Sequence, residues 1–312
     1  MSRRRLFVCS LFLSVSDVSA TQVDLLKPAA QAATSIAKHA EIWLSSGQFN
    51  HDIEGPAVDS SGVLYAVNFA HTGSIGRVNK EGQASLLLDL PKGNTGNGIR
   101  ILPDGDLLVA DYTGHTILRV NVSNKTVSVF AHNEKMHQPN DLTLLKSGVI
   151  FASDPDWSNN TGPLWRINTD GSTTLMEANM GTTNGIEVSP NQRQLYVNES
   201  VQRRVWVYDL STEYELSNKR LLIEFADFGL DGMRADQQGN LYIARYGKGT
   251  VAIVSPQGIL TEEITLVGEF PTNVAFGGCD GRKLFITMQK SGAIESTNVD
   301  FAGASVKQSP SC

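Results

Sequence analysis

Six short polar motifs recur along the chain, and each begins with a carboxylate or carboxamide side chain. Their first residues are 42 to 47 positions apart: Glu54, Asn97, Asn140, Asn184, Asp231 and Asn273. All six side chains offer oxygen atoms, and none of them is basic. Hard cations such as Ca²⁺ bind carboxylate and amide oxygens, so this set predicts metal coordination if the six side chains meet in space.

A repeated strand pattern would bring these residues together. Eight positions after each motif begins, except the one at Asn184, a glycine lies in a turn, and a β-forming run such as "LLVADY" or "LYIARY" follows. A third run comes next, and a fourth closes most copies. Four short strands repeating at this interval are typical of a propeller blade, so six copies predict six blades.

We therefore expect an all-β fold over residues 40–312, a six-bladed β-propeller with four-stranded blades around a central metal-binding channel. A β-sandwich gives no reason for a fixed period, and a solenoid repeats at shorter intervals. The last copy lacks a convincing fourth strand, which the run at residues 40–47 can supply. Each motif then begins an innermost strand, so its first residue would line the axis. We call these six the ring residues.

Glycine directly follows four ring residues, as it would where inner strands crowd together. The charges of the ring favour a divalent cation, because Glu54 and Asp231 would repel each other across the axis unless a cation lay between them. Ligation by oxygen alone favours one Ca²⁺; Mg²⁺ and Mn²⁺ also prefer oxygen, whereas Zn²⁺ prefers His or Cys. The alternative is that each ring residue only caps nearby backbone groups.

Five segments carry a resemblance to a known family: "EGPAVDSSGVLYAVNF", "QPNDLTLLKSGVIFASDP", "TNGIEVSPNQRQLYVNES", "LDGMRADQQGNLYIARYGKGTVAIVSPQG" and "PTNVAFGGCDGRKLFIT". Together they resemble the SMP-30/gluconolactonase/luciferin-regenerating-enzyme-like family, roughly over residues 48–297. The resemblance implies a six-bladed propeller with one catalytic divalent ion, usually Ca²⁺, in its channel. That family includes lactone hydrolases and organophosphate hydrolases.

The resemblance also assigns roles to the ring residues. It implies four metal ligands: Glu54, Asn140, Asn184 and Asp231. Asp231 is in addition the implied catalytic base or nucleophile, and Asn97 and Asn273 are implied on the substrate side. The chain departs from the family pattern at Pro56-Ala57-Val58, where an aromatic residue near the first ligand is absent, at Cys279, which replaces a proline, and in the loop at residues 155–162. These departures leave the choice of substrate open.

The predicted function is metal-dependent hydrolysis of a lactone or a related ester, similar to gluconolactonase. The ion would stabilise the developing oxyanion, and a water molecule shared with it is an alternative attacker because metal ligation lowers the basicity of Asp231. Asp141 and Asp154 are further acids near the channel, although turn or strand-end roles explain them equally well. No G-x-S-x-G motif or histidine triad is present. The alternatives are a non-catalytic binding propeller with a structural ion and an organophosphate-type hydrolase.

The N-terminal region predicts export. Residues 1–20 combine arginines, a short apolar run and a small-residue site, in the order of a signal peptide, and the run is too short to span a bilayer. Residues 21–39 would be a lead-in without evident chemistry. We therefore expect a secreted or periplasmic protein that has no membrane partner.

Net charge and cysteine usage limit the partners further. The formal net charge is −6, with no basic cluster beyond the N-terminus, which argues against a nucleic-acid partner and favours a small-molecule lactone or ester substrate. The sequence does not define the oligomeric state. Cys279 and Cys312 are the two cysteines beyond the signal segment, and whether they pair stays open at this point.

Overall fold

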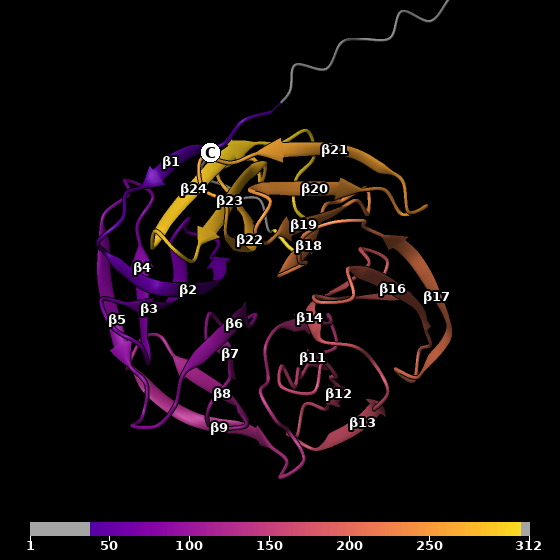
Figure 1. The fold of residues 1–312 in the computed structure, drawn as a ribbon. Coiled ribbons are helices and arrows are strands. Elements are labelled where there is room, and N and C mark those ends of the chain that lie inside the picture. The colour runs from indigo at the N-terminus through magenta and orange to yellow at the C-terminus, as the bar shows by residue number, and fades with distance from the viewer. Residues whose placement is uncertain (1–37, 307–312) are drawn as a thin grey trace, which may run out of the picture. The chain divides into compact units, whose positions relative to one another are not determined.

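The computed structural model describes residues 38–306, which form six four-stranded antiparallel sheets. Figure 1 shows the sheets arranged in a ring around one axis, so the predicted all-β, six-bladed propeller is confirmed. Over these residues every assigned element is a strand, and no helix has the length and hydropathy to cross a membrane. The predicted signal segment and most of the lead-in lie outside the described residues.

Each of the first five blades is a meander of four consecutive strands that runs from the axis outward. The first blade contains β2 (Phe49–Val58), β3 (Leu64–Phe69), β4 (Ser74–Val78) and β5 (Ala84–Asp89). The second contains β6 (Gly96–Ile101), β7 (Leu107–Asp111), β8 (Thr116–Asn121) and β9 (Thr126–His132). The third contains β10 (Leu142–Leu144), β11 (Ile150–Ser153), β12 (Leu164–Ile167) and β13 (Thr173–Glu177).

The next two blades follow the same plan. The fourth contains β14 (Thr183–Val188), β15 (Gln194–Glu199), β16 (Arg204–Leu210) and β17 (Leu216–Glu224). The fifth contains β18 (Met233–Ala235), β19 (Leu241–Arg245), β20 (Thr250–Val254) and β21 (Leu260–Thr265). In the fourth blade, whose first turn lacks the expected glycine, Gln192 adopts a left-handed φ of 57° instead.

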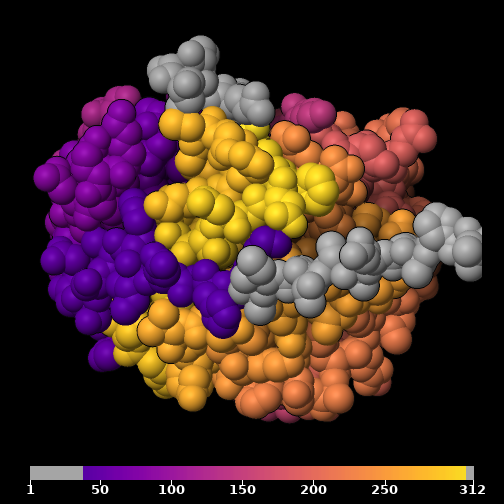
Figure 2. Space-filling view, turned by 90° about the horizontal axis from the view of Figure 1, so that it is seen from above, coloured from indigo at the N-terminus to yellow at the C-terminus, as the bar shows by residue number. Residues whose placement is uncertain are grey.

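The sixth blade is completed by a strand from the other end of the chain. Its consecutive strands are β22 (Pro271–Gly277), β23 (Lys283–Met288) and β24 (Ala293–Asn298). The fourth strand is β1 (Glu41–Leu44), which pairs antiparallel with β24 as the run at residues 40–47 predicted. Figures 1 and 2 show the indigo N-terminal segment beside the yellow last blade. Hydrogen bonds between the two ends of the repeat therefore close the ring.

The inner strands approach one another closely around the axis. Each inner strand contacts the next, and β2 meets both β6 and β22. A Cβ atom on Gly232 would lie 1.9 Å from Asn273 Cγ, and one on Gly55, which has a φ of 61°, would lie 2.0 Å from the carbonyl oxygen of Asn97. No side chain fits at either position, which explains why glycine follows these ring residues.

Apolar side chains fill the spaces between blades. Six clusters of buried hydrophobic residues are present, and each joins two neighbouring blades. Ile99 and Leu107 of the second blade, for example, pack with Val67 and Leu88 of the first. Because every blade is held from both sides, the inner strands, and the polar side chains on them, occupy fixed positions around the axis.

Candidate metal and active site

The structure places all six ring residues within inner strands or just before them. Four lie within strands: Glu54 in β2, Asn97 in β6, Asn184 in β14 and Asn273 in β22. The other two lie two positions before their strands: Asn140 before β10 and Asp231 before β18. Asn97 and Asp231 are half-buried, and the rest are buried. The predicted equivalence of the six positions is therefore reproduced.

Glu54 and Asp231 form a carboxyl pair, in which Glu54 is buried and Asp231 is half-buried. Burial raises the pKa of Asp231 well above its usual range, and the charge of Glu54 raises it further, while a hydrogen bond with Asn184 acts in the opposite direction. Burial likewise raises the pKa of Glu54, to about 7, with the charge of Asp141 as the next cause. Two buried carboxyls side by side cannot both ionise without a compensating cation, so the pair retains a proton when none is bound.

Two carboxamide oxygens of the ring residues lack hydrogen-bond partners within the described residues. Asn140 Oδ1 and Asn184 Oδ1 are buried, and neither accepts a hydrogen bond within the described residues. A buried acceptor without a donor is costly, and such an atom calls for an explanation. Capping of nearby backbone groups, the alternative raised from the sequence, does not explain these two atoms, because a capping oxygen would accept a hydrogen bond from a backbone N–H. A cation would be bound by both oxygens and remove the cost.

These residues fit a divalent ion. Two carboxylates supply the balancing charge, and two unpartnered carboxamide oxygens supply further oxygen ligands of the kind that Ca²⁺ takes. Within residues 38–306, no group of three or more His, Cys, Asp or Glu side chains is placed to hold a metal, so a site of the zinc type is absent there. The assignment of Glu54, Asn140, Asn184 and Asp231 as ligands stays a prediction.

A second polar layer lies beside the ring, and we call its four members the lower cluster: Arg100, Asp141, Glu187 and Arg234. Asp141 Oδ1 is 3.0 Å from Arg100 Nη1, and its Oδ2 is 3.1 Å from Arg234 Nη1. Arg100 Nη2 is 3.4 Å from Glu187 Oε2. The two guanidinium groups lower the pKa of Asp141 despite its complete burial, which acts in the opposite direction. Asp141 is therefore held as a carboxylate.

Sequence reasoning identified Asp141 as a nearby acid but missed the two arginines and Glu187. All three lie three positions after a ring residue, which in a regular strand would direct them to the opposite face. A register shift between Gly96 and Ile99 in β6, and another between Thr183 and Ile186 in β14, change this alternation. One sequence feature could have identified these three residues: a charged residue stands three positions after each of Asn97, Asn184 and Asp231.

The two residues predicted on the substrate side differ in exposure. Asn97 is half-buried, and its Nδ2 donates to the carbonyl oxygen of Asn140 over 3.1 Å. Asn273 is 1 % exposed, and its carboxamide bonds to Asp141 over 3.5 Å and to Glu54. Asn273 thus lies among the axial acids. A substrate-binding role stays a prediction for both residues.

Asp154, the other acid considered from the sequence, anchors the loop before Asn140. Its carboxylate accepts hydrogen bonds from the backbone N–H groups of His137 and Gln138 and from Trp165 Nε1. Burial raises its pKa, although these hydrogen bonds act in the opposite direction. Because the carboxylate of Asp154 accepts these hydrogen bonds from the loop, it positions the segment that carries Asn140.

Polar side chains lie on the exposed side of Asp231. Tyr246 follows β19, and its hydroxyl donates to Gln289 Oε1 over 2.5 Å. Gln289 Nε2 in turn donates to Asp52 Oδ1 over 2.8 Å. Burial raises the pKa of Tyr246, and the charges of Asp231 and Asp52 raise it further, so both acids act on its hydroxyl. These groups could bind hydroxyl groups of a ligand.

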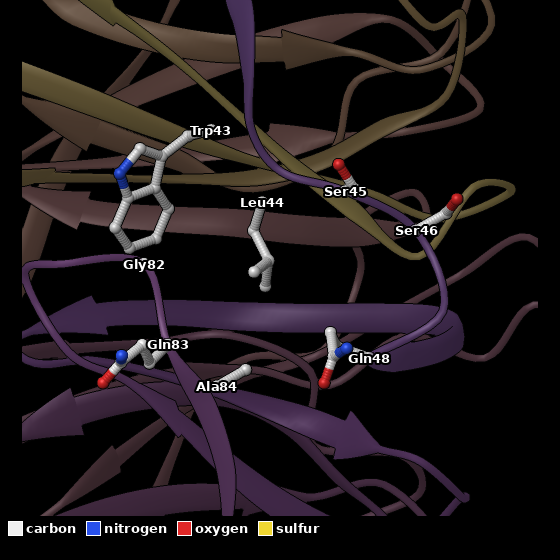
Figure 3. A pocket seen from close by; sticks show the side chains of 8 residues that line it. All are labelled: Trp43, Leu44, Ser45, Ser46, Gln48, Gly82, Gln83 and Ala84. Carbon is white, nitrogen blue, oxygen red and sulfur yellow. The ribbon is translucent and has the colours of Figure 1, made fainter.

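Two surface cavities lie elsewhere, at the seam between the last and first blades. One, of about 430 Å³, is lined by residues 43–46, 48 and 82–84. Figure 3 shows Trp43 and Gln83 at one end of it and Ser46 and Gln48 at the other. The second, of about 530 Å³, includes His51 and Lys290. Neither cavity is lined by a ring residue, and the first contains no acid or base, so we do not assign the chemistry to them.

The structure bears on one of the two cysteines whose pairing the sequence left open. Cys279, in the turn between β22 and β23, is in a disulfide bond. Cys312, the partner considered from the sequence, lies outside the described residues.

Comparisons with known proteins agree with this architecture. A family model described as the SMP-30/Gluconolactonase/LRE-like region matches residues 53–290. A gluconolactonase of Zymomonas mobilis is 32 % identical over 219 residues, which cover 61 % of this chain and 60 % of that protein. A diisopropyl-fluorophosphatase of Loligo vulgaris is 23 % identical, with 77 % of this chain and 87 % of that protein covered.

Solved structures share the fold. A calcium-binding protein from Agrobacterium tumefaciens, described as regucalcin, superimposes with a TM-score of 0.75 at 18 % identity, covering 88 % of this chain and 97 % of that one. The match to the Zymomonas protein, by contrast, spans less than two thirds of that protein's length. The family model nevertheless covers most of this sequence, and the chain belongs to the SMP-30/gluconolactonase/LRE-like family.

Proposed function

We propose that this protein hydrolyses a sugar lactone and depends on one divalent ion, Ca²⁺, bound on the propeller axis. The observation that carries the proposal is the pair of unpartnered oxygens, Asn140 Oδ1 and Asn184 Oδ1, beside the carboxyl pair of Glu54 and Asp231. The family relationship supports the reaction class, since relatives named gluconolactonase, 6-deoxy-6-sulfogluconolactonase and pentonolactonase match this chain at 30 to 32 % identity.

Four ring residues would have two roles in this reaction, ion binding and proton transfer. Glu54, Asn140, Asn184 and Asp231 would hold the ion, which when bound supplies a Lewis acid for the carbonyl oxygen of the ester. Asp231 is the half-buried acid of the set, and it can accept a proton from an attacking water molecule on the exposed side. Glu54 is buried, and its carboxylate would supply the second negative charge that balances the ion.

Recognition of the substrate fits a hydroxylated ring. Tyr246, Gln289 and Asp52 form a connected set of donors and acceptors next to Asp231. Sugar lactones carry several hydroxyl groups, and each can exchange a hydrogen bond with water for one with this set.

A substrate panel tests the proposal. Purified protein is assayed on five- and six-membered sugar lactones, on lactones without hydroxyl groups and on phosphotriesters, after EDTA treatment and after addition of Ca²⁺, Mg²⁺ or Mn²⁺. We expect sugar-lactone hydrolysis that EDTA abolishes and Ca²⁺ restores. Hydrolysis of phosphotriesters alone would instead favour the organophosphatase alternative, which the Loligo relative supports. Ca²⁺ binding without any turnover would favour a non-catalytic binding propeller.

We also propose that the protein is exported, on the strength of its N-terminal residues alone. N-terminal sequencing of the protein from its native host would test this, with a new terminus near residue 21 as the expected result.

A further inference from the structure

Six charged side chains form one buried network on the axis. Four are acids, Glu54, Asp141, Glu187 and Asp231, and two are the guanidinium groups of Arg100 and Arg234. The strongest charges acting on each of the five groups with a resolved shift come from other members of this set. With all six ionised, the network carries a formal charge of −2. That charge matches one divalent ion.

We propose that Arg100 and Arg234 determine the charge of the ion that this site selects. By neutralising Asp141 and Glu187, they leave only Glu54 and Asp231 to balance a cation. This inference rests on the divalent site proposed above, but it concerns residues outside the ligand set.

The geometry of the lower cluster supports this role. The side chains of Arg100, Asp141, Glu187 and Arg234 are 12 %, 0 %, 8 % and 8 % exposed, so water screens their charges weakly. Each follows a ring residue by one or three positions, which keeps it close to the ion. Arg234 Nη2 is buried and has no partner within the described residues, so this guanidinium is not fully used by Asp141.

A change of one charge should therefore alter ion selectivity. Arg234→Gln would leave a network of −3, which favours a trivalent over a divalent ion. Glu187→Gln would leave −1, with the opposite effect. Combining the two substitutions restores −2. A unit charge at an effective dielectric constant of about 20 predicts a change of roughly tenfold in the ratio of Tb³⁺ to Ca²⁺ affinity for each single variant.

The test measures binding and not activity. Tb³⁺ luminescence titrations with Ca²⁺ competition give both dissociation constants for the wild type, Arg234→Gln, Glu187→Gln and their double variant. Arg234→Lys keeps the charge, and Arg119→Gln removes an arginine from the surface pairs with Asp104 and Asp106. We expect opposite changes in the single variants, a wild-type ratio in the double variant, and no change in the two controls.

The outcomes separate this inference from the proposed function. A folded wild type that binds neither ion overturns the divalent site itself. A wild type that binds Ca²⁺, with the same ratio in every folded variant, overturns only the role of the arginines. If Arg234→Gln does not fold by circular dichroism, the lowered Tb³⁺ to Ca²⁺ ratio expected for Glu187→Gln, set against an unchanged ratio in Arg119→Gln, still decides the question.

Discussion

Glu54 and Asp141 are both buried carboxyl groups near the propeller axis, yet their pKa values move in opposite directions. Burial raises the pKa of Glu54 to about 7, and the neighbouring acids reinforce the change. Burial acts on Asp141 in the same direction, but Arg100 and Arg234 outweigh it and lower its pKa. The two groups thus share an environment of low polarity and differ in how closely cations accompany them, because Asp141 forms direct ion pairs with Arg100 and Arg234, whereas the more weakly acting charge of Arg234 does not offset the burial of Glu54.

This difference separates a structural layer from a layer prepared for a ligand. The lower cluster contains its own cations, so Asp141 is satisfied by the chain alone. The ring contains no base, and it leaves two carboxamide oxygens without donors. Buried charge is normally paired or bound to a metal. The layers should therefore respond differently when their acids are neutralised.

The largest effect is expected at Asp231. Asp231→Asn removes one of the two charges that would balance the ion and the acceptor for the proton of the attacking water. We expect a loss of roughly 10²–10⁴-fold in kcat/KM for a sugar lactone, the range for a lost general base. The assay is run at saturating Ca²⁺ so that weakened ion binding alone does not explain the loss.

An exposed acid provides the control for this variant. Asp89→Asn neutralises a carboxylate that pairs only with exposed His71, and it should leave the rate unchanged. If Asp231→Asn kept most of the activity at saturating Ca²⁺, Asp231 could not be the base.

The next effect concerns stability in the lower cluster. Asp141→Asn leaves the buried guanidinium of Arg234 without a carboxylate and leaves Arg100 with Glu187 alone, and removing one partner of a buried pair costs roughly 3–5 kcal/mol. Glu54→Gln, measured in EDTA, removes a buried carboxyl that forms no ion pair within the described residues and whose burial outweighs the opposing charge of Arg234, so the free energy of unfolding should not fall. Urea denaturation of both variants measures the contrast.

Asp209→Asn is the matched surface control for Asp141→Asn. Its pair with Arg220 has a separation of 2.8 Å, but both side chains are more than 40 % exposed and solvent screens their charges, so we expect little loss of stability. Equal destabilisation by Asp141→Asn and Glu54→Gln would show that the two layers do not differ as described.

The raised pKa values of the buried axial acids should make stability depend on pH when no ion is bound. The folded protein holds protons on Glu54 up to a pKa of about 7 and on Glu187 up to about 6, whereas both lose them near 4.5 in the unfolded chain. The folded state therefore binds more protons between these values, and its stability falls as the pH rises from about 4.5 to 7.

Urea midpoints across this range, in EDTA and in Ca²⁺, test the prediction. Ca²⁺ should remove the part of the decline that belongs to Glu54, and Glu54→Gln in EDTA should remove the same part. Stability that rises over this range in EDTA would contradict the raised pKa values.

The sequence predicted the fold well because the repeat is a property of the chain itself. The interval between ring residues, the glycines beside them and the strand at residues 40–47 each had a direct structural counterpart in the described residues. The lower cluster was missed because register shifts in the inner strands change which residues face the axis. Such shifts depend on how blades pack, which one strand does not encode.

The polar set near Asp231 was also beyond the sequence. Tyr246 and Gln289 lie in the turns that follow β19 and β23, and Asp52 lies in β2, so the three residues belong to three blades and only the closed ring brings them together. Their residue types are common in surface loops, so no single one indicated a binding role.

The smallest effect is expected at Tyr246, which belongs to neither layer and would contact the substrate. Tyr246→Phe removes a hydroxyl that bonds Gln289 and lies near Asp231, but it leaves the acids and the ring in place. One lost hydrogen bond is worth about 1 kcal/mol, so KM for a sugar lactone should rise roughly fivefold while kcat is unchanged. A lactone without hydroxyl groups should show no change. Tyr196→Phe, whose hydroxyl bonds only Gln194, is the control. Equal increases in KM for both lactones would mean that Tyr246 shapes the site generally and does not recognise hydroxyl groups.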